Sequence, residues 1–592
     1  MSDSSSLEPI RHSLAHLLAA AVLKKYPGTK LGIGPVIENG FYYDFKFPEP
    51  VGDDILPELE KSMRQFAAAG LPFTGREVTP DEAKKLFADQ PFKLDLIEEY
   101  AGEGRTLTIY KTGDIFEDLC RGGHVENTKT IPADAFALTH LAGAYWRGNE
   151  KNAQLVRIYG LAFGFKADLD AHRKMLEEAK KRDHKILGPA LDLFTFSDLV
   201  GSGLPLWTPR GTILRNLLDD FVWELRKKRG YLRVEIPHIT KKDLYEKSGH
   251  WDKFKDELFR ITTREGHEFA MKPMNCPHHT QIYARRPWSY RELPQRYANT
   301  TTCYRDEQSG ELAGLSRVRS FSQDDAHVFC RMSQAKEEFL KVWDIVHEFY
   351  PKFGFSLRVR LSLHDPEHPE KYLGDKNGWA VAEGILREIV TEKNIEWFEG
   401  VGEAAFYGPK LDFMAKDAIG REWQVATIQL DMNMPERFDL TCTNERGEKE
   451  RIVMIHAAIM GSIERFLSVL IEHLAGAFPL WLAPVQAVVI PVSEKFEGYA
   501  KIVLGALLEG GIRAELSPAD ETLGKRIREA EKIKTPYVLV VGEKEEAAKS
   551  VNVRHAKRGP SSTEASKGEQ EGELALDALR DKLLKEIEER AL

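Results

Sequence analysis

The sequence has little cysteine and no long apolar run, which argues against a disulfide-rich secreted protein and against a membrane protein. Its 592 residues include five scattered cysteines, which predicts a reducing compartment and leaves each thiol to be considered as a ligand, a reactive group or core. No apolar run reaches the ~18–20 residues of a membrane helix. The first residues have neither the basic nor the apolar segment of a secretion signal. We therefore expect a cytoplasmic protein without a membrane segment.

Basic charge and the common phosphate-binding motifs are also missing. The net charge is -9, so any nucleic-acid contact must come from local basic patches. The pattern GxxxxGK[ST] does not occur, and no GxGxxG follows a predicted strand. These absences argue against P-loop and Rossmann nucleotide folds.

The length and the periodicity of the chain predict about four domains. Between residues 188 and 482, strict βαβ alternation is absent, which predicts a largely antiparallel sheet flanked by helices. Expected helices there span 212–229, 333–350, 379–393 and 455–473, with strands at 357–363 and 423–431. After Pro484, strands and helices alternate and predict a small α/β domain with a parallel sheet. A polar loop at 558–573 and a helix at 575–591 follow.

The N-terminal part predicts a separate α+β domain. Helices are expected at 13–24 and 55–70, and 39–47 alternates like a strand. The charged segment 168–187 predicts one helix that bridges two domains. The expected division is 1–166, a linker helix at 167–187, 188–482, and 483–592.

Two histidines and a Cys-His pair form the first candidate site. His12 and His16 lie one helical turn apart, and Cys120 and His124 share a predicted turn. The four side chains are a plausible tetrahedral zinc set. They could equally form a hydrolytic pocket that positions water and transfers protons, or be unrelated core residues.

Cys276, His327 and His456 form a second candidate set. Each could be an ordinary buried residue, and the sequence alone does not bring them together. If they converge, three protein ligands on Zn²⁺ leave a fourth position open, as in a working metal site.

Two arginines occur in segments suited to phosphate binding. Residues 300–329 predict a β-hairpin that holds Arg305 on a rigid strand, although a salt-bridged surface hairpin has the same pattern. Gly461 precedes Ser462 at a turn that opens a helix carrying Arg465, which could meet an outer phosphate or pair with an acidic residue.

Together these segments resemble the three signature motifs of class II aminoacyl-tRNA synthetases, and in detail the threonyl-tRNA synthetase family. Motif one resembles the helix 216–229 and the strand that ends at Pro237; motif two resembles YRDE; motif three resembles GSIERF. The blocks MKPMNCP, RVRSFSQDDAHVFC and TIQLDMNMPERFDL share that likeness. The resemblance covers nearly the whole chain, with the blocks in the family's order.

The resemblance implies a class II antiparallel sheet flanked by helices, an α+β editing domain and a C-terminal α/β anticodon-binding domain. It implies ATP-dependent activation of L-threonine, transfer to tRNA(Thr), Mg²⁺ with ATP, one Zn²⁺ per chain and a homodimer. The zinc ligands would be Cys276, His327 and His456.

The same resemblance implies roles for single residues. Arg305 would hold the α-phosphate and Arg465 the γ-phosphate, with Glu307 near the adenine and Arg317 near ATP. Asp325 would accept from the threonine hydroxyl. Further pocket or family positions are Gln323, Tyr407, Lys410, Gln424, Gln429 and Ser462. The editing site would be metal-free and consist of His12, His16, Cys120 and His124 with Lys93 and Asp118. Glu545 and Arg554 would read the anticodon.

Three positions depart from the family pattern. Bacterial members carry a small ubiquitin-like domain before the editing domain, and we expect it to be absent because the histidine helix begins near residue 12. Gly123 stands where proline is usual, which bears on the rigidity of the editing loop. His278 and Ala457 differ from the usual neighbours of the zinc ligands, but the ligand positions are intact.

The chemistry gives an independent reason for two sites. Threonine and valine are near-isosteres, and an apolar pocket separates a hydroxyl from a methyl by only ~100-fold. A metal and a buried carboxylate would lose their partner with valine. Serine keeps the hydroxyl and lacks a methyl worth about 1–3 kcal/mol, so a second, hydrolytic site is needed to remove it. A synthetase for serine or proline, and an RNA-binding paralogue without catalysis, are the competing hypotheses.

Overall fold

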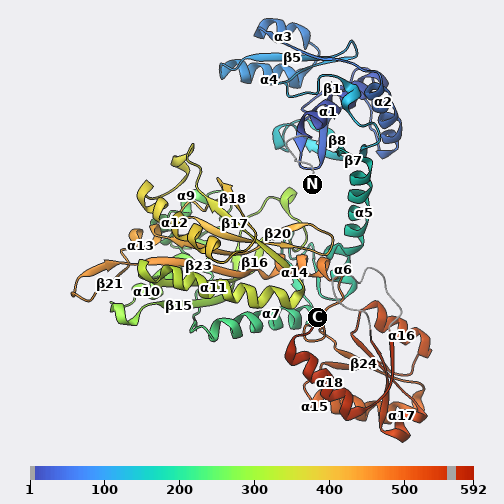
Figure 1. The fold of residues 1–592 in the computed structure, drawn as a ribbon, viewed down its shortest axis with the longest axis vertical. Coiled ribbons are helices and arrows are strands. Elements are labelled where there is room, and N and C mark those ends of the chain that lie inside the picture. Colours follow the sequence, from blue (N-terminus) through green and yellow to red (C-terminus); the bar gives the residue numbers. More distant parts are fainter. Residues whose placement is uncertain (1–6, 556–568) are drawn as a thin grey trace. The chain divides into compact units, whose positions relative to one another are not determined.

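The computed structural model describes residues 7–555 and 569–592 (Figure 1). The chain forms two compact units, Met1–Glu177 and Glu178–Leu592, and each is considered by itself. Within the described ranges, no helix combines the length and the apolar character needed to cross a bilayer.

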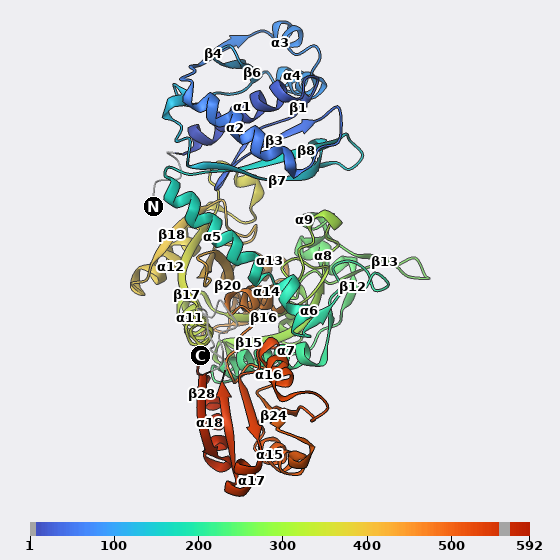
Figure 2. The same cartoon turned by 90° about the vertical axis from the view of Figure 1, so that its right-hand side faces the viewer.

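The first unit contains two antiparallel sheets with helices packed on them (Figure 2). The larger sheet has the order β1-β3-β8-β7, with β2 on β3, and the smaller has the order β4-β5-β6. The strands are β1 Lys30–Leu31, β2 Val36–Ile37, β3 Gly40–Lys46, β4 Phe73–Val78, β5 Leu107–Thr112, β6 Phe116–Leu119, β7 Phe136–Tyr145 and β8 Gln154–Ala162. The helices are α1 Glu8–Lys25, α2 Leu56–Ala68, α3 Pro80–Leu86 and α4 Pro91–Gly102.

Helix α1 lies in the core of this unit. Its run of alanine and leucine favours a helix and leaves no polar side, so the segment is buried on nearly every face. It packs against α2 and β3, and this burial brings His16 into the interior. The predicted strand at 39–47 and helix at 55–70 are confirmed by β3 and α2.

The prediction of a single linker helix is wrong, because the helix is interrupted at Asp183. Helix α5 spans Lys166–Arg182, and a second helix, α6, spans His184–Ala190. Asp183 has an extended ψ of 117°, and its carboxylate accepts a hydrogen bond from Lys185 N at 2.9 Å. A short acidic side chain that competes for backbone N–H groups ends one helix and caps the next.

The second unit is built on an eight-stranded sheet with the order β11-β15-β16-β23-β20-β19-β17-β18 (Figure 1). Only the outer pairs, β11 with β15 and β17 with β18, are parallel. The strands are β11 Leu232–Arg233, β15 Gln295–Tyr304, β16 Ser320–Cys330, β17 Ser356–Leu363, β18 Trp397–Val401, β19 Lys410–Lys416, β20 Glu422–Asp431 and β23 Val453–Ser462. The expected antiparallel sheet is confirmed.

Smaller elements surround this sheet. Short strands are β9 Phe194–Thr195, β10 Leu206–Trp207, β12 Ile239–Lys241, β13 Arg260–Thr262, β14 Glu268–Met271, β21 Thr441–Thr443 and β22 Lys449–Arg451. The helices are α7 Pro209–Lys227, α8 Lys242–Ser248, α9 His250–Lys253, α10 Cys276–Ala284, α11 Ala335–Phe349, α12 Lys376–Glu392, α13 Asn433–Arg437 and α14 Ile463–His473. Helices α7, α11 and α12 match three of the predicted helices.

The fourth predicted helix, 455–473, is half wrong. Its first eight residues belong to β23, which is hydrogen-bonded to β16 on one side and β20 on the other. Two neighbouring strands satisfy the backbone groups of this apolar segment, so pairing overrides its helical pattern. Gly461 has φ +71° and ends the strand, and Ser462 Oγ accepts from Arg465 N to open α14.

The C-terminal part carries a mixed sheet with the order β25-β24-β26-β27-β28. The predicted parallel pairing holds for β24, β25 and β26, whereas β27 and β28 are antiparallel. The predicted loop at 558–573 is wrong from residue 569 on, where β28 begins; its residues before 569 lie outside the described residues. The elements are β24 Ala487–Pro491, α15 Glu497–Glu509, β25 Ala514–Leu516, α16 Leu523–Lys532, β26 Tyr537–Val541, α17 Glu543–Ala548, β27 Ser550–His555, β28 Glu569–Ala575 and α18 Leu576–Glu589.

A buried ion pair fixes the irregular end of β23. The register between β16 and β23 shifts between Gln323 and Asp325, and the Asp324 carboxylate accepts from Ile459 N at 2.9 Å and Met460 N at 3.0 Å. Arg226 of α7 donates to the same carboxylate at 3.3 Å. Both charged side chains are almost fully buried. The pair therefore joins α7 to the bulge that precedes Ser462.

We expect Asp324→Ala to lower the free energy of unfolding of the second unit by about 3–5 kcal/mol, because Arg226 would keep a buried charge without its partner. Denaturant unfolding followed by tryptophan fluorescence measures the change. Asp256→Ala removes an exposed carboxylate and is the matched control, with an expected change within about 0.5 kcal/mol. Equal stabilities for the two variants would contradict this role of Asp324.

Two candidate active sites

The register of two strands brings the second predicted metal set together. His327 on β16 stands directly opposite His456 on β23, and Cys276 is the first residue of α10. Their ligand atoms all lie within 4.8 Å of one another, and all three side chains are buried. Residues separated by 180 positions thus meet at one point.

Each histidine of this set uses one ring nitrogen for a neighbour. His456 Nε2 lies 2.9 Å from Asp431 Oδ2, and His327 Nδ1 lies 2.7 Å from His279 Nδ1. The two remaining nitrogens, His327 Nε2 and His456 Nδ1, are 3.1 Å apart. Two nitrogens on a tetrahedral Zn²⁺ are separated by about 3.3–3.4 Å, and a carboxylate behind a metal-bound imidazole is a common support. The donor set therefore fits a zinc ion.

Burial also favours the uncharged forms of these side chains. It lowers the pKa of His327 well below its usual value, so the imidazole is neutral, as a ligand must be. It raises the pKa of the Cys276 thiol, with a further contribution from nearby Asp325. A cation that binds here must displace the thiol proton.

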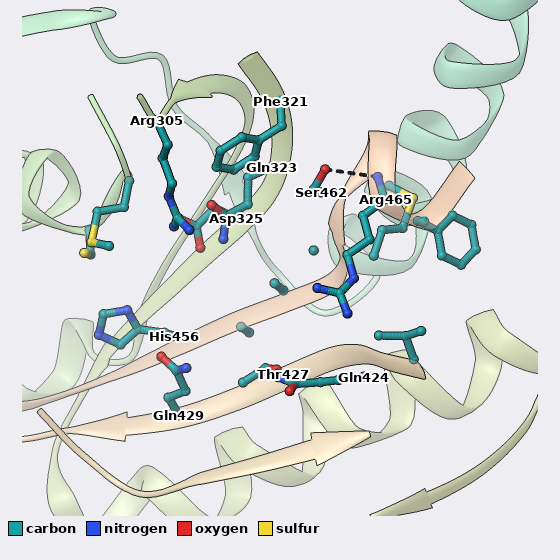
Figure 3. A pocket seen from close by; sticks show the side chains of 18 of the residues that line it. Arg305, Phe321, Gln323, Asp325, Gln424, Thr427, Gln429, His456, Ser462 and Arg465 are labelled. Carbon is teal, nitrogen blue, oxygen red and sulfur yellow. Dashed lines mark hydrogen bonds between the residues drawn. The ribbon is translucent and has the colours of Figure 1, made fainter. Parts of the chain in front are cut away.

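A cavity of about 390 Å³ lies beside this set (Figure 3). Two cationic side chains reach it from different elements, Arg305 from the end of β15 and Arg465 from the first turn of α14. The predicted residues that line the cavity are Cys276, Arg305, Gln323, Asp325, Tyr407, Gln424, Gln429, His456, Ser462 and Arg465. The cavity thus joins a candidate metal set to two arginines suited to phosphate.

A β-bulge at Val425 lets Gln424 face the cavity together with two other polar residues of β20. Gln424 and Gln429 are an odd number of residues apart, so strict alternation would put them on opposite faces of β20. The register with β19 shifts at this point, since Phe413 faces Ala426 and Met414 faces Gln424. The bulge turns Gln424 to the same face as Gln429 and Thr427, and Thr427, which alternation with Gln429 could have indicated, was missed by sequence reasoning.

Four of the residues predicted for this site do not line the cavity: His327 of the metal set, and Lys410, Glu307 and Arg317. Lys410 is ion-paired at 2.9 Å with buried Asp412, which also accepts from Gln424 Nε2 at 2.8 Å. Glu307 accepts from Arg317 Nε at 2.8 Å. Glu307 and Arg317 thus stand paired with each other, and Lys410 shares the carboxylate that holds the amide of Gln424.

Sequence reasoning also missed supporting residues. Asp431 lies two residues after Gln429, so alternation along β20 could have placed it on the cavity side near His456. His279 lies on α10, three residues after Cys276, which is the spacing of neighbours on one helix face. Phe321 lines the cavity, and its ring lies 5.2 Å from the Arg305 guanidinium.

The first unit holds a second cavity, of about 330 Å³, with the other predicted set beside it. His12 and His16 come from α1, and Cys120 follows β6. The Cys120 Sγ atom lies 3.3 Å from His12 Nε2 and 3.1 Å from His124 Nε2. The ligand atoms of the four residues lie within 4.8 Å of one another, so both zinc binding and hydrolysis remain compatible with the distances.

A buried ion pair adjoins this set. Lys93 Nζ lies 2.6 Å from Asp118 Oδ1, and Tyr43 donates to Asp118 Oδ2 at 2.5 Å. Desolvation lowers the pKa of His124 to about 2 and raises that of Cys120 to about 11. At neutral pH the site therefore offers uncharged imidazoles and a protonated thiol beside a carboxylate.

The loop that carries His124 has a conformation suited to glycine. Gly122 and Gly123 have φ values of +88° and +78°. Proline fixes φ near −65°, so it could not occupy position 123 in this conformation. Gly122 N donates to Cys120 Sγ at 3.3 Å, and Ser13 Oγ lies 3.2 Å from His124 Nδ1. These contacts hold the loop on α1.

The two predicted anticodon residues lie on adjacent elements of the C-terminal part. Glu545 is in α17, where its carboxylate accepts from Gly542 N at 2.9 Å and caps the helix. Arg554 is on β27, opposite Val538. The structure gives Glu545 a capping role that sequence reasoning did not include.

Three family models match the chain. Residues 259–474 match the tRNA synthetase class II core domain (G, H, P, S and T), and 486–586 match an anticodon binding domain. Residues 107–159 match the threonyl and alanyl tRNA synthetase second additional domain.

Curated relatives are similar over almost their whole length. The threonine–tRNA ligase of Deinococcus radiodurans is 47% identical over 577 residues, which are 96% of this chain and 88% of the relative. That of Gloeobacter violaceus is 48% identical over 594 residues, 99% of this chain and 94% of the relative.

Solved structures agree with these relatives. The RNA binding domain of threonyl-tRNA synthetase from Cryptosporidium parvum Iowa II has a TM-score of 0.63 and 38% identity, covering 68% of this chain and 98% of its own. Putative threonyl-tRNA synthetase ThrRS-1 from Aeropyrum pernix has a TM-score of 0.61 and 31% identity, covering 69% and 97%. With its class II core and its zinc-compatible cavity, the chain belongs to the threonyl-tRNA synthetase family.

Proposed function

We propose that this chain is a threonine–tRNA ligase: it activates L-threonine with ATP, transfers it to tRNA(Thr) and hydrolyses seryl-tRNA(Thr) at a separate site. One observation carries the proposal. A single cavity is lined by Cys276 and His456 of the metal-competent set, by the Asp325 carboxylate, and by two arginines suited to phosphate. Proline offers no side-chain hydroxyl to pair with Asp325, so this lining does not suit a synthetase for proline.

Cys276, His327 and His456 would hold one Zn²⁺ per chain, supported by Asp431 behind His456. When bound, the ion supplies a Lewis-acid position that the amino and hydroxyl groups of threonine can fill. Selection of the amino acid otherwise falls to the side chains of the cavity.

Asp325 would accept a hydrogen bond from the threonine hydroxyl. It is buried, and Asn275 Nδ2 donates to its Oδ2 at 3.1 Å, which leaves Oδ1 for a substrate hydroxyl. Valine offers no donor, so a buried carboxylate oxygen would stay unpaired at a cost of about 1–3 kcal/mol. Gln323, Tyr407, Gln424, Gln429 and Ser462 complete the polar lining.

Arg305 and Arg465 would neutralise the phosphates of ATP, which enters with Mg²⁺. The threonine carboxylate attacks the α-phosphate in line, and threonyl-adenylate and pyrophosphate form. The chain contributes by holding the reactants in place and by offering fixed positive charge where negative charge develops. Glu307 and Arg317 would lie by the adenine and ATP, and Lys410 would hold Asp412 beside the cavity.

The site in the first unit would hydrolyse the ester of a mischarged serine. Desolvation lowers the pKa of His12, so its imidazole is uncharged and can accept a proton from water, whereas the pKa of His124 falls to about 2, which makes that ring too weak a base for this role. His16, Cys120, Lys93 and Asp118 would hold the acyl end of the tRNA. Hydrolysis is the reason to expect this set without metal, although its distances also suit one.

The remaining properties are proposed from the same family membership. The four parts would be an editing domain (1–166), a linker (167–187), a catalytic domain (188–482) and an anticodon-binding domain (483–592), with Glu545 and Arg554 at the anticodon. Five free cysteines suit a cytoplasmic location. A second copy would cover the exposed Leu199, Val200 and Leu206 next to motif one and complete a homodimer.

The first prediction concerns the metal set. Cys276→Ser should remove bound zinc and threonine-dependent ATP–pyrophosphate exchange together, because the thiolate is the soft donor of the set. Metal analysis and exchange are measured on one preparation. Cys442→Ser, which changes a buried cysteine outside the set, should leave both intact. Exchange at the wild-type rate in the Cys276 variant would show that the site is assigned wrongly.

The second prediction separates hydrolysis from charging. The double variant His12→Ala, His16→Ala should charge threonine normally and accumulate seryl-tRNA, because the second cavity loses a proton acceptor, His12, and a residue that holds the acyl end, His16. Deacylation of preformed seryl-tRNA(Thr) measures the effect, and a fall of at least 100-fold is expected. His140→Ala, an exposed histidine of the same unit, is the control. Unchanged deacylation would remove the editing assignment.

The third prediction concerns the pH dependence of the Cys120 thiol. Its pKa is raised to about 11, mainly by desolvation, so the reactive thiolate is scarce at neutral pH and increases as the pH rises. Alkylation by iodoacetamide, followed by mass spectrometry, should therefore stay slow at pH 8. Asp118 raises this pKa, so Asp118→Asn should shift the profile to lower pH. A wild-type midpoint near pH 8.5 would contradict the described environment.

A further inference from the structure

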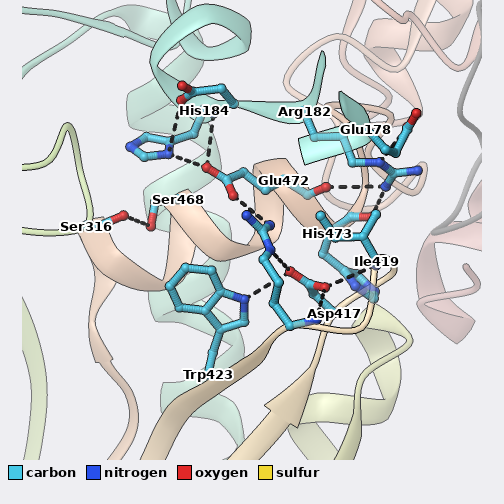
Figure 4. A network of polar contacts seen from close by, with 12 residues as sticks. Glu178, Arg182, His184, Ser316, Asp417, Ile419, Trp423, Ser468, Glu472 and His473 are labelled. Atoms are coloured by element: carbon cyan, nitrogen blue, oxygen red, sulfur yellow. Dashed lines mark hydrogen bonds and ion pairs between the residues drawn. The ribbon is translucent and has the colours of Figure 1, made fainter. Parts of the chain in front are cut away.

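A histidine outside both cavities joins three segments of the second unit (Figure 4). His184 is the first residue of α6, and its Nδ1 lies 2.6 Å from Glu472 Oε1 near the end of α14. On its other side, His184 Nε2 accepts a hydrogen bond from Leu315 N at 3.1 Å. Both His184 and Leu315 are buried.

The two bonds fix the tautomer of His184 and exclude one alternative. An acceptor at Nε2 and a carboxylate at Nδ1 require a proton on Nδ1. Asp183, His184 and Glu472 are close enough to suggest a metal site. Neither ring nitrogen of His184 has a lone pair left for a cation, so the cluster acts as a structural junction.

This junction binds the loop between β15 and β16 through its backbone. Leu315 lies near the tip of this loop, and Gly314 beside it has φ +55°. A Cβ atom on Gly314 would lie 2.4 Å from His184 Nε2, so the backbone approaches the imidazole as closely as only glycine allows. Ser316 Oγ donates to Ser468 Oγ at 2.9 Å, which ties the same tip to α14.

Helix α14 is itself fixed at its C-terminal end (Figure 4). Arg182 donates to the carbonyl oxygens of Glu472 at 3.3 Å and His473 at 2.9 Å, where unpaired carbonyls favour a cation. Arg421 forms ion pairs of 2.7 Å with both Glu472 and Asp417. The first turn of the same helix carries Arg465. The tip of the loop therefore contacts a helix whose C-terminal end is held in place by Arg182 and Arg421.

We infer that His184 is a positioning residue for adenylate formation: it holds the loop that carries Glu307 and Arg317 through the backbone of Leu315. Glu307 and Arg317 stand on the two arms of this loop and bond to each other at 2.8 Å, so a shift of the tip moves both. The inference rests on the proposed function, because it assigns His184 to the ATP side of that reaction. His184 does not line the cavity and acts only through its neighbours.

The test is threonine-dependent ATP–pyrophosphate exchange with the full chain. His184→Ala should raise KM for ATP by about tenfold, because Leu315 N loses its partner and Glu472 keeps only Arg421 and the backbone of residue 184, and should change KM for threonine less than twofold. His184→Gln should restore most of the wild-type KM for ATP, since an amide can donate and accept across the same gap. Lys181→Ala, an exposed change on α5, is the matched control and should leave both constants unchanged.

A double-mutant cycle with Gly314→Ala makes the test specific. In the wild-type background the new methyl group would collide with the His184 ring and with Lys185 Cγ and displace the loop, whereas in the His184→Ala background the collision with the ring, which is the closer one, is relieved. The increase in KM for ATP caused by Gly314→Ala should therefore be at least threefold smaller when residue 184 is alanine.

The outcomes separate this inference from the proposed function. If the wild-type chain shows no threonine-dependent exchange, the proposed function fails first. If the wild type is active and the His184→Ala variant raises both KM values equally, or the effects of the two substitutions simply multiply, His184 does not position the loop. A thermal melting scan of each variant identifies a general loss of folding, which would lower the active fraction and not the KM for ATP alone.

Discussion

The antiparallel pairing of β16 with β23 is the constraint on which the first site depends. This register sets His327 opposite His456, and β16 also carries Asp325 and Gln323, two and four residues earlier. At its end β23 leads through Gly461 into the helix that bears Arg465. One strand pair therefore places a metal-competent set, a hydroxyl acceptor and a cation along one cavity. A shift of one residue would turn every second side chain away from it.

The two sites differ in the physical means by which they handle similar amino acids. In the proposed function, the cavity of the second unit would reject valine, because the buried carboxylate would have no hydroxyl to accept from and the metal-competent set would hold an ion without a hydroxyl ligand. Serine satisfies the same groups, and one methyl group changes binding only slightly. The other cavity holds neutral imidazoles beside the Lys93–Asp118 pair, which suits proton transfer during hydrolysis. The two sites would thus act on different competitors: valine is rejected in the first, and serine is removed in the second.

Sequence reasoning succeeded where the signal is local. His12 and His16 are one turn apart, and helices such as α7 and α11 follow from periodicity. It failed where neighbouring strands decide the outcome. Residues 455–462 read as helix and are a central strand, and nothing in the sequence of β20 marks the bulge at Val425 that turns Gln424 to the cavity. Asp324 and His184 were missed because their partners are 98 or more residues away.

X-ray absorption at the zinc K-edge of the purified full-length protein tests the central claim most directly. The account predicts one ion per chain with a single sulfur neighbour at about 2.3 Å and nitrogen or oxygen neighbours at about 2.0–2.1 Å. Addition of threonine should alter the nitrogen and oxygen shell and leave the sulfur distance in place. A spectrum without sulfur, or with several sulfur neighbours, would contradict convergence of Cys276, His327 and His456 on one ion.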